Sequence, residues 1–111
     1  MPKQREVLRK IVALKRQSAE QYLRAIQMEA DRIVSDIAQL NANLHALDEA
    51  RAGFDALRLA EEHGHARKLI SDIRAAEAAL AIKRSELHEA REALKRAFHS
   101  QERLGEAGTK V

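Results

Sequence analysis

Apolar residues recur at alternating intervals of three and four along most of this chain, and this spacing restricts its fold more than any other feature. The first row, called here the first seam, is Val12, Arg16, Ala19, Leu23, Ile26, Ala30, Ile33, Ile37, Leu40, Leu44, Leu47, Arg51 and Phe54. The second seam is Leu69, Ile73, Ala76, Leu80, Lys83, Leu87, Ala90, Leu94, Ala97, Gln101 and Leu104. A mean repeat of about 3.5 residues is typical of a helix that supercoils against another helix.

The composition favours long helices and argues against a sheet. Ala, Leu, Glu, Lys and Arg make up 66 of the 111 residues, whereas aromatic residues account for 3%. Strands prefer β-branched and aromatic residues, and a wide globular core needs many large side chains. We therefore predict an all-α fold with a thin core between two helices.

The expected helix boundaries lie where the apolar spacing stops. Glu61–His65 contributes no apolar residue to either seam, and Gly64 suits a turn. We predict a single domain over 1–104 with a helix at about 4–60, a turn at about 61–66 and a helix at about 67–104, followed by a flexible tail at 105–111. This fold is an antiparallel two-helix coiled-coil hairpin with a longer N-terminal helix.

The expected register leaves the start of the chain without an internal partner. It places Lys83 near Leu40 and Leu104 near Ala19, so residues before about 19 extend beyond the second helix. Several of these residues are nevertheless apolar. An apolar stripe without an internal partner is typical of a binding surface.

Charge is unevenly distributed, although the formal net charge is only +3. Residues 1–24 hold seven Lys or Arg and two Glu, and residues 67–111 hold ten basic and seven acidic residues. Residues 25–66, in contrast, hold three basic and eight acidic residues. In a hairpin both termini bring positive charge to one end, which can orient the molecule between two unlike partners.

Catalytic, cofactor and metal sites are not predicted. The chain has no Cys, and His63 and His65 beside Glu62 lack the further ligands of a tetrahedral metal site. A two-helix core also lacks the concavity that shelters a reaction. The sequence contains no apolar run long enough to cross a membrane, and its opening residues lack the apolar run of a signal peptide. We expect a cytoplasmic protein.

Two stretches resemble one known family. The segment EAREALKRAFHSQERL, from Glu89 to Leu104, is similar to the C-terminal helix of the FliJ family, the small stalk proteins of the flagellar type III export apparatus. The opening from Leu8 to Leu23, with Lys and Arg among apolar residues, is similar to that family's N-terminal arm. The resemblance spans nearly the whole chain.

The resemblance implies a non-enzymatic role in protein export. Proteins similar to FliJ insert their terminal end into the pore of a hexameric export ATPase. They also contact the cytoplasmic domain of the membrane export gate, and they can bind export chaperones. The implied location is cytoplasmic and peripheral at the inner membrane.

We expect two groups of contact residues on this basis. The ATPase-binding end would comprise Val7, Leu8, Ile11, Val12, Lys15, Arg16, Lys95, Arg96 and Arg103. The export-gate contact would comprise Phe54 and Leu57 near the tip.

Other functions remain open at this point. A coiled-coil adaptor or chaperone of another system has the same sequence features. A helical-hairpin nucleic-acid binder is a further alternative, although Tyr22 is the only aromatic residue near the basic start of the chain. The resemblance fits both flagellar and injectisome systems, and two such seams can also pair between chains as a four-helix assembly.

Overall fold

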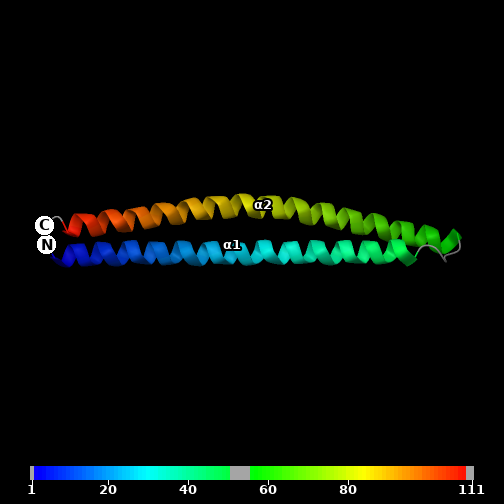
Figure 1. Ribbon diagram of the computed structural model, residues 1–111, viewed down its shortest axis with the longest axis horizontal. Helices are drawn as coiled ribbons and strands as arrows, with labels where there is room; N and C mark the ends of the chain where they lie inside the picture. Colours follow the sequence, from blue (N-terminus) through cyan, green and yellow to red (C-terminus); the bar gives the residue numbers. More distant parts are fainter. Residues whose placement is uncertain (1, 51–55, 110–111) are drawn as a thin grey trace. The chain divides into compact units, whose positions relative to one another are not determined.

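The described part of the chain forms two long helices. The computed structural model describes residues 2–50 and 56–109, and these residues are helical throughout. Helix α1 spans Pro2–Ala50 and helix α2 spans Ala56–Thr109 (Figure 1). No strand occurs in these two ranges, which confirms the all-α prediction. The chain divides into a terminal unit, Met1–Met28 with Arg84–Val111, and a central unit, Glu29–Lys83.

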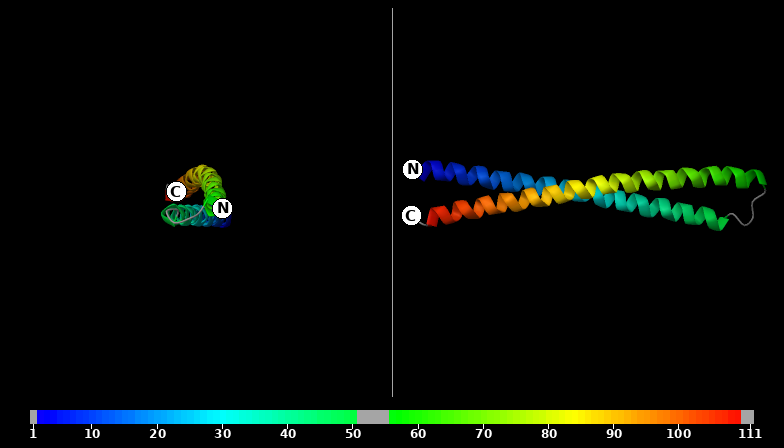
Figure 2. Two further views of the ribbon diagram at one scale, coloured as in Figure 1. Left: turned by 90° about the vertical axis from the view of Figure 1, so that its right-hand side faces the viewer. Right: turned by 90° about the horizontal axis from the view of Figure 1, so that it is seen from above.

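The terminal unit packs the start of α1 against the end of α2, drawn blue and red in Figures 1 and 2. Its core holds Ile26, Leu87 and Ala90, with Leu23 packed against them. Farther toward the start of α1, Arg16 contacts Gln101 of α2. The contacts therefore run in opposite order along the two helical segments of this unit.

The central unit is organised around a second set of buried aliphatic side chains. The buried residues are Ala30, Leu69, Ile73 and Leu80. Lys83 is a charged residue at a seam position of this unit. Its Nζ lies 2.7 Å from Oε2 of Glu29 on α1, so the carboxylate neutralises the ammonium group while the stem of the lysine stays half-buried.

Both seams are confirmed within the described residues. Every seam position from Val12 to Leu47 and from Leu69 to Leu104 is buried or half-buried. The remaining two members of the first seam, Arg51 and Phe54, lie outside the described residues. The 3–4 spacing therefore identified the sides on which the helices pack.

The predicted turn at 61–66 is wrong, because these residues lie inside α2. Glu62 and Ala66 are half-buried and continue the second seam backward from Leu69. Because Glu is charged and Ala is small, this part of the seam does not stand out in the sequence. Helix α1 ends at Ala50 and α2 begins at Ala56, so the expected helix to about 60 and the expected start at about 67 are also wrong.

Helix α1 is not the longer helix of the two. It has 49 residues and α2 has 54. Helix α2 continues past Gly105 to Thr109, where the sequence predicted a tail. A helical glycine costs only about 1 kcal/mol relative to Ala, so Gly105 alone does not end a long helix.

The register differs from the predicted one because α1 ends, and α2 begins, nearer the N-terminus than expected. Lys83 contacts Glu29 rather than lying near Leu40, a displacement of about three helical turns along α1. As a result, α2 also accompanies the start of α1. Arg9, Lys10 and Ala13 line one hollow together with Gln101, Leu104 and Gly105. The predicted overhang before residue 19 is therefore wrong.

Replacement of Gly64 tests the corrected helix boundary. We expect Gly64→Ala to increase the free energy of unfolding by about 0.5–1 kcal/mol, because Ala favours helix and nothing lies within 4 Å of the added Cβ. Urea denaturation followed by circular dichroism measures the change. A decrease would indicate that Gly64 occupies a turn after all.

Truncation of a buried residue tests the core of the terminal unit. Ile26 is 4% exposed, so Ile26→Ala should lower the free energy of unfolding by about 2–4 kcal/mol. Met28, two residues along the same helix, is 67% exposed, so Met28→Ala should change it by less than about 0.5 kcal/mol. Equal losses for the two variants would show that this side of α1 does not face the core.

Candidate protein-binding surface

The start of α1 carries exposed aliphatic residues. Val7, Ile11 and Leu14 are 54%, 43% and 63% exposed, and we call these three residues the outer stripe. Leu8 borders the stripe and is 49% exposed. Large aliphatic side chains that gather on one face of a helix, rather than scattering singly, mark a candidate binding surface.

The outer stripe lies on the side of α1 that faces away from α2. Successive residues of an α-helix are separated by about 100°, so the three stripe residues share one side, opposite Val12 and Arg16. Val12 and Arg16 are half-buried seam residues. This segment of α1 is therefore apolar on two opposite sides, and only one of them is covered by the chain itself.

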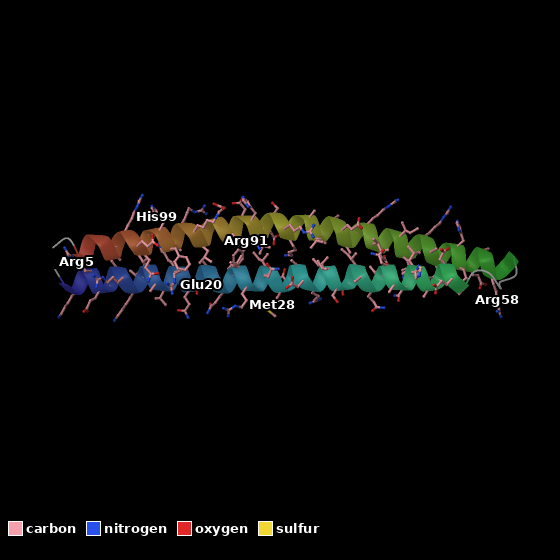
Figure 3. All side chains as sticks on the ribbon, viewed as in Figure 1. Arg5, Glu20, Met28, Arg58, Arg91 and His99 are labelled. Atoms are coloured by element: carbon pink, nitrogen blue, oxygen red, sulfur yellow. The ribbon has the colours of Figure 1, made fainter. Side chains whose placement is uncertain are left out.

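Lysine residues border the outer stripe. Lys3 and Lys10 flank it on one side, and Lys15 flanks it on the other; all three are exposed. Glu6, the one acidic residue between positions 3 and 19, is three residues from Lys3 and four from Lys10, so it lies beside that border but outside the stripe. The surface is thus apolar along its middle, and its borders carry a net positive charge. Figure 3 shows the side chains of this segment beside the labelled Arg5.

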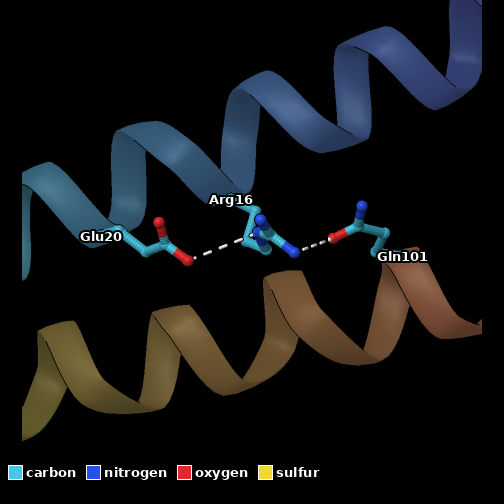
Figure 4. A network of polar contacts seen from close by, with 3 residues as sticks. All are labelled: Arg16, Glu20 and Gln101. Atoms are coloured by element: carbon cyan, nitrogen blue, oxygen red, sulfur yellow. Dashed lines mark hydrogen bonds and ion pairs between the residues drawn. The ribbon is translucent and has the colours of Figure 1, made fainter.

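Arg16 ties the two helices of the terminal unit together rather than facing outward. Its Nη1 donates a hydrogen bond of 2.9 Å to Oε1 of Gln101, and its guanidinium carbon lies 5.0 Å from the ring centroid of Phe98 (Figure 4 shows the polar contacts). Its Nε is buried and lies 3.4 Å from Oε1 of Glu20, close enough for an ion pair but without a hydrogen bond.

The expected ATPase-binding residues fall into separate groups. Val7, Leu8 and Ile11 are exposed on or beside the outer stripe. The basic residues of this expected set that are exposed are Lys15, Lys95, Arg96 and Arg103. Val12 and Arg16 face α2 and contribute to packing within the unit.

Two of the expected basic residues come together across the helices. Lys15 and Arg96 line one groove with a volume of about 390 Å³, together with the half-buried Val12. Lys95 instead contacts its own helix, with its Nζ 3.2 Å from Oε1 of Glu92. Of the expected basic residues, Lys15 on α1 and Arg96 on α2 therefore lie at the same groove between the two helices.

Three contributors were not among the expected site residues. Leu14 completes the outer stripe, and Lys3 and Lys10 form one of its borders. In the sequence, Leu14 could have been found from a second i, i+4, i+7 spacing at Val7, Ile11 and Leu14, which lies on a different side of the helix from the seam. The predicted register leaves the whole segment before residue 19 unpaired, so it does not separate these residues from the seam residue Val12.

The expected export-gate residues cannot be placed on a surface. Phe54 lies outside the described residues, and so does the side chain of Leu57. A hollow of about 450 Å³ lies in the central unit, with Leu44, Leu47, Ala66 and Ile70 as its apolar lining. His63 also lines it, but the described residues contain no cluster of three or more potential metal ligands.

Comparisons with protein-family models, with curated proteins and with solved structures find no match to this chain. Within the described residues, neither helix has the length of apolar sequence needed to cross a membrane. The resemblance to FliJ stays a prediction, and the function is argued below from the surface itself.

Removal of the Arg16 side chain tests its role between the helices. Arg16→Ala should lower the free energy of unfolding by about 1 kcal/mol, a modest loss because the side chain is 36% exposed and partly screened by water. A double-mutant cycle with Gln101→Ala, measured by urea denaturation, should give a coupling energy above about 0.5 kcal/mol. Strict additivity of the two changes would contradict the bridge.

Proposed function

We propose that this chain is a non-enzymatic stalk protein of a flagellar type III export apparatus, similar to FliJ. In this proposal it folds as an antiparallel coiled-coil hairpin whose terminal end docks into the hexameric export ATPase. The tip region around Phe54 and Leu57 is its contact with the cytoplasmic domain of the export gate. The protein is cytoplasmic and reaches the inner membrane through that gate, and export chaperones are further partners.

One observation carries the proposal: exposed apolar and basic residues occur together on the terminal unit. Val7, Leu8 and Ile11 are exposed on α1, and Arg96 and Arg103 are exposed on α2. Both helices therefore supply positive charge to the unit that contains the two ends of the chain. A stalk that inserts its terminal end into a ring of subunits needs such a surface on both helices.

A stalk acts by coupling rather than by catalysis. If one unit binds the ATPase and the other contacts the gate, each partner can bias the state of the other through its differential affinity for the stalk. Opposite charge on the two sections supports two unlike partners. The terminal unit holds 13 Lys or Arg and seven Asp or Glu, most of its excess coming from residues 1–28, whereas the central unit holds seven basic and ten acidic residues.

Binding to a purified hexameric export ATPase from the same organism tests the proposal. The wild-type chain should bind, and Arg96→Gln with Arg103→Gln should weaken binding by about threefold to tenfold through loss of charge at the terminal unit. Arg67→Gln with Arg74→Gln removes the same charge from exposed positions of the central unit and should have little effect. Biolayer interferometry gives the dissociation constants.

Two results would count against the stalk. Absence of wild-type binding would remove the ATPase as a partner. Salt-sensitive binding to mixed-sequence DNA or RNA, without binding to the ATPase, would favour a nucleic-acid function instead.

A further inference from the structure

We propose that the outer stripe of α1 is a helix-in-groove ligand, and that it binds a groove on another protein with an apolar floor and carboxylate borders. The stripe is Val7, Ile11 and Leu14, and its basic borders are Lys3, Lys10 and Lys15. The inference rests on the proposed function, because it specifies which side of the terminal unit docks.

The spacing of the stripe suits a groove. Residues at i, i+4 and i+7 lie on one side of a helix, and amphipathic helices bind grooves through anchors at these positions. All three side chains are substantially exposed, so a groove would remove considerable apolar surface from water. The opposite side of the same segment packs on α2, which holds the helix in place before binding. Little ordering is then required when the partner arrives.

Charge determines the kind of groove. Lysines lie on both sides of the stripe, and no carboxylate lies within it. A groove bordered by Asp or Glu would pair with these lysines, whereas a neutral groove would offer them no opposite charge. Basic borders also steer the approach of an acidic partner and make binding weaker as the salt concentration rises.

The same charges argue against a second copy of this chain. Two outer stripes packed face to face would bring lysines against lysines, and like charges across an interface are unfavourable. A membrane surface is also less suitable. Residues 3–15 contain no Trp, Tyr or Phe, the residues that anchor interfacial helices at the boundary of the bilayer.

A pair of variants with the same charge change isolates the stripe. Ile11→Asp places a carboxylate in its middle, and Asn43→Asp makes the same charge change at an exposed position of α1 in the central unit. Both positions are exposed, so both variants should melt at the wild-type temperature, as checked by circular dichroism. Binding to the purified export ATPase should weaken about tenfold or more for Ile11→Asp and less than about twofold for Asn43→Asp.

The lysine borders are tested separately. Lys10→Gln with Lys15→Gln should weaken binding to the ATPase and reduce its dependence on salt concentration, because two of the screened charges are gone. An unchanged salt dependence would contradict the carboxylate borders of the groove.

The outcomes separate this inference from the proposed function. Absence of wild-type binding to the ATPase would overturn both. Wild-type binding that is equally strong for Ile11→Asp would overturn the inference alone. Two other results would also overturn it: loss of a wild-type dimer in Ile11→Asp during analytical ultracentrifugation, or loss by Ile11→Asp of binding to vesicles of phosphatidylcholine and phosphatidylserine in equal amounts.

Discussion

Burial of one apolar side of each helix is the constraint on which the rest of this structure depends. Two helices can cover only a narrow strip between them, so the described core consists of a few aliphatic residues such as Ile26, Leu80 and Leu87. No described side chain is less than 2% exposed. Stability is therefore spread along the seams, and most of the molecule is surface available to other proteins.

Polar residues within the seams specify how the helices pair. Aliphatic residues at a 3–4 spacing pack almost equally well after a shift of one heptad, so they determine the register only weakly. Lys83 with Glu29 in the central unit, and Arg16 with Gln101 in the terminal unit, are pairs that a shifted register would break. Their net energies are modest, because all of them remain partly exposed, but their specificity does not depend on a large net energy.

The sequence predicted which sides of the helices pack, and it misplaced their link. Large aliphatic residues such as Leu23, Ile73 and Leu80 repeat clearly, so the seam positions from Val12 to Leu47 and from Leu69 to Leu104 could be found. Between residues 60 and 66 the seam uses Glu62 and Ala66, whose side chains give no apolar signal, and Gly64 suggested a turn. A glycine inside a helix costs only about 1 kcal/mol relative to Ala, and the packing of α2 on α1 outweighs this cost. The error in the link then carried over into the register and the supposed overhang.

At the candidate site, too, the sequence did not show which residues pack inside the molecule and which are exposed. Val7, Leu8, Ile11 and Val12 are equally aliphatic, so the sequence could group them but could not say which of them face α2. That choice depends on where α2 ends, and α2 continues to Thr109 beside the start of α1. Beside α2, Val12 is half-buried, whereas Val7 and Ile11 stay exposed. The side that packs on α2 and the proposed docking side are therefore opposite sides of the same four turns of helix, so each can be changed without the other.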